Sequence, residues 1–158
     1  VKEVNPKVTL ETLIPDFNGI EELINTVIDS GPNIVSHNME TVRRLTPKVR
    51  SRAKYDISLK TIETIAKSGK AKPKSGVMLG LGETEEELFE TMDDLINVGC
   101  KVLTIGQYLQ PTKKHLTVKR YVTPDEFLRY KEVGLEKGFQ FVESGPLVRS
   151  SYRAERHI

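Results

Sequence analysis

Short apolar segments alternate along the chain with longer segments whose apolar residues recur at helical spacing. The four apolar segments cover residues 8–14, 33–35, 75–81 and 101–106, and each runs into glycine or polar residues. Runs of this length bounded by turn-forming residues are typical of β-strands. Strands that alternate with helices through short connections predict right-handed crossovers and a parallel sheet. The fold class expected from this pattern is α/β.

The segments between the strands predict helices, and several residues mark where these helices begin and end. Apolar residues recur with helical spacing over residues 20–28 and predict a first helix, with Asn18 as its N-cap. A short helix that follows is expected to stop before Pro47, because proline disrupts a helix interior. A third helix is expected from about Ser58 to Gly69.

Two later helices begin with a capping box, in which a threonine and the glutamate three residues later each accept a hydrogen bond from the other's backbone N–H. The pairs are Thr84 with Glu87 and Thr123 with Glu126. Both helices are expected to stop near the next glycines along the chain, Gly99 and Gly138. Residues 139–158 then predict a short strand followed by an irregular C-terminal tail.

Four βα units amount to about half of an eight-unit barrel, or about two-thirds of a six-unit one. The expected domains are a partial βα barrel over residues 1–138 and the C-terminal strand and tail over residues 139–158. The strand at residues 8–14 is then an open sheet edge, which is a hazard for unwanted pairing. We therefore expect its missing neighbour in an N-terminal portion before Val1, and an isolated chain that self-associates or is unstable.

Composition limits the compartment more than it limits the function. The 158 residues are 37% hydrophobic and 29% charged, which is ordinary for a globular domain. The net charge of +2 argues neither for nor against nucleic-acid binding, and no apolar run approaches the length of a membrane span. The lone cysteine, Cys100, excludes an internal disulfide framework and fits a reducing compartment. The cytoplasm, or an organelle matrix, is the expected location.

Polar residues follow each predicted strand, and a parallel sheet brings all of these positions to one rim. The residues concerned are Asp16, His37, Asn38, Glu40, Gly80, Gly82, Glu83, Gln107 and Tyr108. Glycines near the end of the third strand remove side chains where a backbone could approach a flat ligand. An exposed strand-end peptide there could hydrogen-bond the edge of a nucleobase, while Glu83 braces the turn.

Each rim residue also has a purely structural interpretation. The glycines are equally typical of a buried strand that packs closely, and Glu83 of a helix N-terminus. His37 is more often a hydrogen-bonded structural histidine than a metal ligand, and Cys100 is best explained as a small buried apolar residue. Iron–sulfur clusters need several cysteine thiolates, which this chain does not have. The agreement of four rim clusters in position favours a binding site.

The tail contains Arg149, Arg153 and Arg156 together with two serines, Ser150 and Ser151. Its arginines are consistent with simple solvation, and its serines with capping of a turn.

With these residues the chain closely resembles the lipoyl synthases, a family of radical S-adenosylmethionine enzymes. The segments that carry the resemblance are IPDF (14–17), HNMETV (37–42), KSGVMLGLGET (74–84), LTIGQYLQP (103–111), YVTPDEF (121–127) and SGPLVRSSY (144–152). They cover nearly the whole chain, in order, but only the C-terminal half of the family's pattern. Both N-terminal cysteine motifs of the family are absent.

The resemblance implies that these strands are the last four of an incomplete TIM-like (β/α)6 radical SAM barrel. It implies the insertion of two sulfur atoms at C6 and C8 of a protein-bound octanoyl-lysine, with S-adenosylmethionine as cofactor and two 4Fe-4S clusters in the full-length enzyme. The implied partners are an octanoylated lipoyl carrier domain or the glycine cleavage H protein, and an electron donor such as ferredoxin or flavodoxin. Neither nucleic acid nor a membrane is an expected partner. Alone, the chain is expected to be inactive.

The resemblance also implies roles for individual residues. Adenine is expected to contact, mainly through backbone, Gly76, Met78, Gly80 and Glu83, with Met78 where isoleucine is common in the wider pattern. The methionine or ribose part is expected to contact Asn38 and Glu40, and the border of the site to include Gln107 and Tyr108. A tail serine is expected to bind iron, with Ser151 the better match and Ser150 the fallback.

Two other functions remain open from the residues. A TIM-barrel fragment could use the same strand ends to bind a phosphorylated metabolite. A non-catalytic module could bind a lipoyl carrier domain, whose acidic surface would meet basic residues of the chain, namely Lys113, Lys114 and the three tail arginines.

Overall fold

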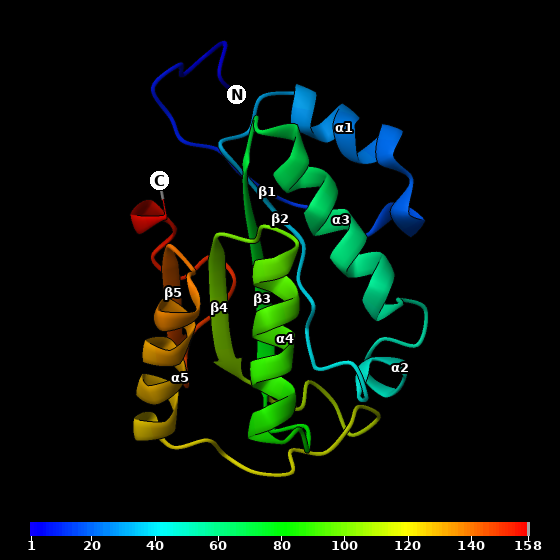
Figure 1. The fold of residues 1–158 in the computed structure, drawn as a ribbon, viewed down its shortest axis with the longest axis vertical. Coiled ribbons are helices and arrows are strands. Elements are labelled where there is room, and N and C mark those ends of the chain that lie inside the picture. Colours follow the sequence, from blue (N-terminus) through cyan, green and yellow to red (C-terminus); the bar gives the residue numbers. More distant parts are fainter. Residues whose placement is uncertain (158) are drawn as a thin grey trace.

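A computed structural model describes residues 1–157 and shows an α/β fold built on one parallel sheet (Figure 1). The strands are β1 (Glu11–Leu13), β2 (Ile34–Ser36), β3 (Lys72–Leu79), β4 (Val102–Gln107) and β5 (Phe141–Gly145). They lie in the sheet in chain order, and every neighbouring pair is parallel. The sheet is open, with β1 and β5 at its edges, so the described residues form no closed barrel.

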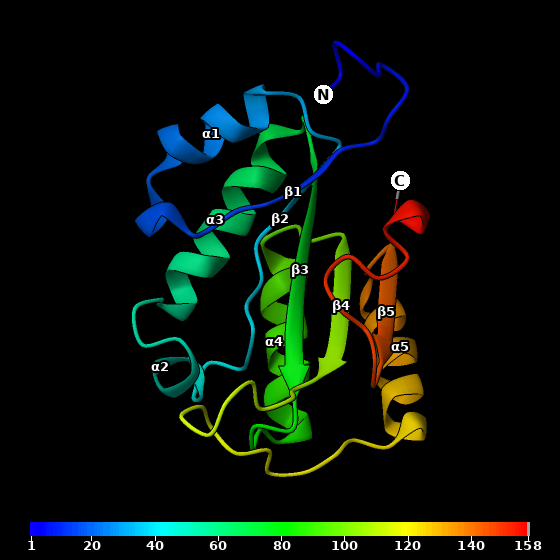
Figure 2. The ribbon, with the colours of Figure 1, turned by 180° about the vertical axis from the view of Figure 1, so that it is seen from behind.

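The helices cover one face of this sheet. They are α1 (Glu21–Asp29), α2 (Thr46–Val49), α3 (Tyr55–Ser68), α4 (Glu85–Asn97) and α5 (Pro124–Lys137), with the 3₁₀ turns η1 (Phe17–Gly19) and η2 (Ala154–Arg156). Figures 1 and 2 show α3, α4 and α5 on the same side of the strands, with α1 packed on α3. Figure 2 shows the tail, residues 146–157, on the opposite face alongside β4 and β5. We call this second face the inner face.

The period-two alternation of the strands separates an apolar face from a polar one. Toward the helices, Val77 and Leu79 of β3 and Ile105 of β4 pack in the main core with Leu88 and other residues of α4. The inner face instead carries charged and small residues: Glu11, Lys72, Lys74, Gly76, Thr104 and Gly106. Helices therefore cover the apolar face of the sheet, and among residues 1–157 the tail lies on the polar face.

Several expected helix boundaries are confirmed. Both capping boxes are present, at the start of α4 and at the start of α5. Gly69 ends α3 and Gly138 ends α5, each in the left-handed conformation, with φ of 63° and 111°. Glycine has no Cβ to clash in that conformation, which is why it so often ends helices.

Two expectations about local structure were wrong. Asn18 does not cap α1: it lies in η1 with φ of 54°, and the Asp16 side chain accepts a hydrogen bond from its backbone N–H. Pro47 does not stop a helix but lies in the first turn of α2, where the missing N–H of proline costs nothing. The short strand predicted within residues 139–158 is present as β5, and it pairs in parallel with β4 as the fifth strand of the sheet.

No helix in residues 1–157 combines the length and the apolar character that a membrane crossing requires.

Candidate functional site

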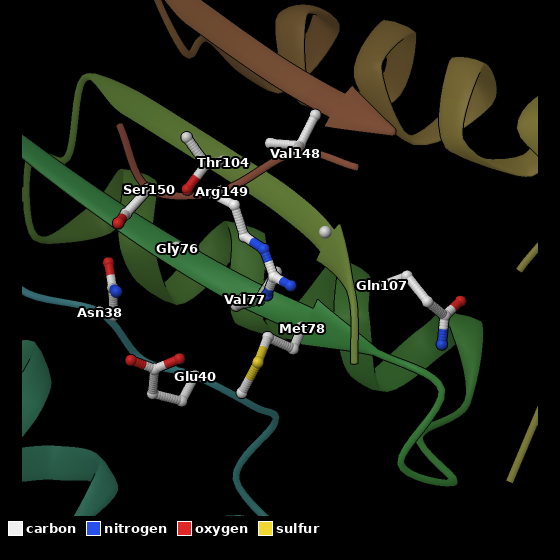
Figure 3. Close-up of a pocket in the computed structure, with 11 residues that line it drawn as sticks. Asn38, Glu40, Gly76, Val77, Met78, Thr104, Gln107, Val148, Arg149 and Ser150 are labelled. Atoms are coloured by element: carbon white, nitrogen blue, oxygen red, sulfur yellow. The ribbon is translucent and has the colours of Figure 1, made fainter. Parts of the chain in front are cut away.

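A cavity of about 140 Å³ lies on the inner face of the sheet, between the strand ends and the tail. Its lining comes from the segment after β2, from β3, from β4 and from the tail: Asn38, Glu40, Gly76, Val77, Met78, Thr104, Gly106, Gln107, Val148, Arg149 and Ser150. Figure 3 shows Arg149 and Ser150 reaching over β3 from the tail, while Asn38 and Glu40 lie on its other side. Segments far apart in sequence therefore build one site.

The chain after β2 is held against β3 in a way that directs Glu40 to the cavity. The backbone N–H of Glu40 donates to the carbonyl of Gly76 at 2.9 Å, and its carbonyl accepts from Met78 N–H at 2.8 Å. Glu40 has φ of 66°, a left-handed conformation that is uncommon for a residue with a side chain. These two hydrogen bonds hold the strained residue in place, as is typical of functional positions. Among residues 1–157, Glu40 forms no ion pair.

Asn38 presents an unused hydrogen-bond acceptor to the same space. Its Oδ1 is buried and has no partner within the described part of the chain. A buried polar atom without a partner is costly, so it usually indicates a missing water or ligand.

Two glycines keep the cavity open. A Cβ on Gly76 would lie 2.6 Å from Thr104 Oγ1 and 3.0 Å from Asn38 Oδ1. A Cβ on Gly106 would clash with the backbone carbonyl of Val148 in the tail. Because neither glycine has a positive φ, space rather than backbone conformation explains these positions.

Gly80 and Glu83 form a turn at the end of β3 that lies outside the cavity lining. Glu83 Oε1 accepts from Gly80 N–H at 2.7 Å, and Oε2 accepts from Leu81 N–H at 2.9 Å. Gly80 and Gly82 have φ of 100° and 104°, so both occupy conformations that favour glycine. The prediction that Glu83 braces this turn is confirmed.

Gln107 lines the cavity, but its amide is already bonded to the protein. Nε2 donates to the carbonyls of Leu79 and Tyr108, both at 3.0 Å, and Oε1 accepts from Val122 N–H at 2.9 Å. Gln107 thus fixes the segment after β4 to the end of β3. Tyr108 is buried outside the cavity lining, and its hydroxyl donates to the Leu116 carbonyl at 2.9 Å.

Of the two tail serines, Ser150 lines the cavity and Ser151 is exposed outside it. Ser150, the second choice from the sequence, is therefore the serine that lies near the other predicted residues. The iron-binding role of either serine stays a prediction.

Three further residues line the cavity that were not among the predicted ones: Thr104, Gly106 and Val148. Period-two counting back from the end of β4 places Gly106 and Thr104 on one face, so the strand pattern contained that signal. Nothing local indicated Val148, because its position depends on how the tail folds back.

His37 has the structural role that its alternative interpretation gave it. Its Nδ1 lies 2.9 Å from the Ile14 carbonyl and its Nε2 lies 2.9 Å from Ser58 Oγ, which also accepts from Arg50. A carbonyl only accepts, so the proton is on Nδ1 and Nε2 accepts from the serine. Burial lowers the pKa of His37, and the nearby Arg50 lowers it further.

The described residues do not supply the ligands of an iron–sulfur cluster. Cys100 is buried, and burial raises the pKa of its thiol to about 12, which opposes the thiolate that a metal needs. Residues 1–157 contain no group of three or more His, Cys, Asp or Glu that could hold a metal ion.

Comparison with known proteins places the chain in a family. Residues 1–95 match the radical SAM superfamily. Over its whole length the chain is 61% identical to lipoyl synthase from Treponema denticola, of which it covers 54%. It is also 61% identical to lipoyl synthase from Bacteroides thetaiotaomicron, of which it covers 56%. Identity to lipoyl synthase from Flavobacterium johnsoniae is 58%, with 55% of that protein covered. The chain thus spans about half the length of the curated relatives it matches.

Solved structures agree on the fold. Streptococcus suis SuiB superposes with a TM-score of 0.65 at 14% identity over 85% of this chain and 32% of that one. SuiB bound to S-adenosylmethionine gives a TM-score of 0.59 at 12% identity over 91% of this chain and 41% of that one. At such low identity these likenesses concern the fold alone. The chain belongs to the radical SAM superfamily, and along its whole length it is similar to lipoyl synthases.

Proposed function

We propose that this chain is part of a lipoyl synthase and that the cavity on its inner face binds the adenosyl and methionine parts of S-adenosylmethionine. The observation that carries the proposal is the convergence of Asn38, Glu40, Gly76 and Met78 on one cavity. The whole protein would insert two sulfur atoms at C6 and C8 of an octanoyl chain amide-linked to a lysine. The similarity to lipoyl synthases along all 158 residues supports this assignment.

The residues present fit such a ligand. The Oδ1 of Asn38, which has no partner among residues 1–157, can accept a hydrogen bond from a ribose hydroxyl or an ammonium group. The carboxylate of Glu40, which forms no ion pair among the same residues, attracts the ammonium. Gly76 adds no side chain to the cavity, and Gly106 lets the tail backbone approach the sheet so that the tail covers the cavity. Gly80 and Glu83 act indirectly, by holding the end of β3 in shape.

When bound, S-adenosylmethionine would supply the radical that removes hydrogen from the octanoyl carbons. The work of the chain itself is to orient the cofactor and to exclude water from the cavity, which the tail covers on one side. No step through an iron–sulfur cluster is derived for the described residues, because they lack its cysteine ligands. Alone, the chain would therefore bind ligand without turning it over.

We further propose an octanoylated carrier domain or the glycine cleavage H protein as substrate and a ferredoxin or flavodoxin as electron donor. The exposed arginines of the tail support contact with an acidic carrier surface. A cytoplasmic or matrix location belongs to the same proposal.

The test is ligand binding by matched glycine variants. Gly76→Ala places a methyl group in the cavity, and we expect the affinity for S-adenosylmethionine and for 5′-deoxyadenosine to fall by about tenfold or more in calorimetric titration. Gly145→Ala is the control, because Gly145 does not line the cavity and its new Cβ would meet only Val148 Cγ2, at the ordinary contact distance of 3.4 Å.

Three outcomes would contradict the proposal. The wild-type chain could bind neither nucleoside, or the two variants could weaken binding equally. Tighter binding of a phosphorylated sugar than of either nucleoside would favour a phosphometabolite site instead.

A further inference from the structure

The charged half of the inner face lies next to the cavity and has no part in the proposed ligand site. Lys74 of β3 is buried there, with its side chain 1% exposed. Its Nζ donates to Glu11 Oε2 of β1 at 2.8 Å and lies 3.3 Å from Nδ1 of His157 in the tail. A buried ammonium needs acceptors around it, and the tail supplies one of them.

His157 contacts the sheet in three ways. Besides the contact with Lys74, its carbonyl accepts from Lys72 Nζ at 2.8 Å, and its ring centroid lies 6.0 Å from that of Phe141 in β5. The residue is fully buried. Backbone hydrogen bonds within residues 149–157 are local turns, so His157 is where the far part of the tail meets the sheet.

The near part of the tail is fixed at a different place. After β5, the backbone turns back through a hydrogen bond from Val148 N–H to the Gly145 carbonyl at 3.1 Å. Val148 is buried, and its carbonyl lies against Gly106, where no side chain intervenes. Arg149 and Ser150, which line the cavity, lie between the Val148 contact and the His157 contact.

The contact with Lys74 requires one protonation state of His157. An ammonium only donates, so Nδ1 must accept and the ring proton must be on Nε2. A protonated imidazole would instead turn an N–H toward Lys74. We infer that His157 is a positioning residue, whose neutral imidazole accepts a hydrogen bond from Lys74 and thereby holds Arg149 and Ser150 over the cavity.

The charged groups around His157 agree with a neutral ring. Lys74 and Lys72 face it from β3, Glu11 from β1, Glu143 from β5, and Glu155 from the tail. Burial lowers the pKa of His157 first, and Lys74 lowers it further, while the three carboxylates act in the opposite direction. Nε2 of His157 is buried and has no hydrogen-bond partner among the described residues. No carboxylate therefore bonds to Nε2 and stabilises a doubly protonated ring.

The test follows the tail itself, and it requires no ligand, so its result is independent of the proposed function. The tail contains three trypsin sites, Arg149, Arg153 and Arg156. In the 158-residue chain at pH 7.5, we expect His157→Ala to raise cleavage in the tail by about tenfold relative to wild type, because opening exposes the segment. Cleavage at Lys113 and Lys114 in an exposed loop is the internal reference and should not change.

His157→Asn separates hydrogen bonding from simple loss of the side chain. The Asn Oδ1 replaces Nδ1 as an acceptor and does not titrate, so we expect cleavage within about twofold of wild type. Hydrogen–deuterium exchange of residues 146–157, corrected for intrinsic rates, should rise in the wild type between pH 7.5 and pH 5.5 and stay level in the Asn variant. His115→Ala, in an exposed loop, is the matched control and should behave as wild type.

Each alternative result would overturn the inference. Equal tail cleavage in wild type and His157→Ala would show that the residue does not hold the tail. Equal acceleration at the tail and at the loop reference would indicate general destabilisation. If the tail of His157→Asn were cleaved as fast as that of His157→Ala, the hydrogen bond from Lys74 would not be what holds the tail. The same conclusion would follow if exchange in His157→Asn rose at pH 5.5 as much as in wild type.

Discussion

His37 shows how a single residue near a binding site can be structural. It follows β2 directly, one position before Asn38, yet its ring faces the helices and joins the Ile14 carbonyl to Ser58 of α3. Both ring nitrogens are used, so none is left for a ligand or a metal. The neighbouring Asn38, by contrast, leaves an acceptor unused in the cavity. Period-two alternation after the strand sends adjacent residues to opposite faces.

The lowered pKa values of His37 and His157 predict how the stability of the chain depends on pH. The pKa values of His37 and His157 are both lowered in the folded chain, mainly by burial, below their ordinary value near 6.5. An unfolded chain then binds more protons than the folded one as the pH falls through this range. The contribution of the two neutral histidines to the free energy of unfolding is complete above about pH 6.5, and it is lost as the pH falls toward their pKa values in the folded chain.

We therefore expect the free energy of unfolding in urea to decrease from pH 7.5 to pH 5.5. A His37→Asn variant should be less stable than wild type at pH 7.5 but should show a smaller decrease on acidification. Wild-type stability that is constant or higher at pH 5.5 would contradict the assignment of neutral, buried histidines.

At the scale of elements, the turn between β3 and α4 is fixed by one side chain. The Glu83 carboxylate accepts two backbone N–H groups, and the capping box of Thr84 and Glu87 starts the helix immediately afterwards. Glu87 also accepts from Arg44 Nε at 2.6 Å, which ties the segment before α2 to the start of α4. The strand end, the turn and the helix start therefore form one continuous hydrogen-bonded unit.

Removing the Glu83 carboxylate should loosen this unit. We expect Glu83→Ala to lower the free energy of unfolding by about 2 kcal/mol, because two backbone donors lose a charged acceptor. Glu83→Gln keeps one acceptor oxygen and should lose about half as much. Urea denaturation measures both, with Glu136→Ala on the exposed side of α5 as a control that should change little. An alanine variant as stable as that control would show that the turn does not depend on Glu83.

At the scale of the whole molecule, the sheet is incomplete on the β1 side. β1 pairs only with β2, and Leu13 at its end is 57% exposed. An open parallel edge with exposed apolar residues is a template for pairing with another chain. The chain spans about half the length of the lipoyl synthases that it matches.

We expect the 158-residue chain to self-associate in light scattering coupled to size exclusion, and Leu13→Lys to reduce that association by placing a charge at the edge. Leu128→Lys is a matched control, because Leu128 is equally exposed at 57% but lies on α5, away from β1. A monomeric wild-type chain, or equal effects of the two substitutions, would show that the β1 edge is not the surface concerned.

Much of the fold could be predicted from the sequence because the signals concerned are local. The apolar segments became strands of one parallel sheet, and the capping boxes and helix-ending glycines were found where the sequence placed them. Two local predictions failed. Asn18 does not cap α1, because it lies in a 3₁₀ turn where the Asp16 side chain accepts a hydrogen bond from its backbone N–H. Pro47 does not end a helix, because it lies in the first turn of α2.

The candidate site could be predicted only in part. Strand-end position and family resemblance predict a site that contains Asn38, Glu40, Gly76 and Met78, and these four residues do line one cavity. Gln107 also lines it, but with its amide engaged by backbone groups that no sequence pattern indicates. Gly80, Glu83, Tyr108 and Ser151 lie outside the lining. Glu83 is bonded to Gly80 within the turn, Tyr108 is buried against the loop that follows β4, and Ser151 is exposed.

Local patterns in the sequence were sufficient to predict the strands, the helices and the polar rim, since backbone hydrogen bonding and side-chain alternation are short-range effects. Three features follow from the folded chain: the tail crosses the inner face, Ser150 rather than Ser151 lines the cavity, and Lys74 contacts His157, 83 residues further along the chain. These features depend on whether the free energy gained by pairing charged groups exceeds the cost of burying them. Both energies depend on how far water is excluded, which is fixed only when segments distant in sequence pack against each other.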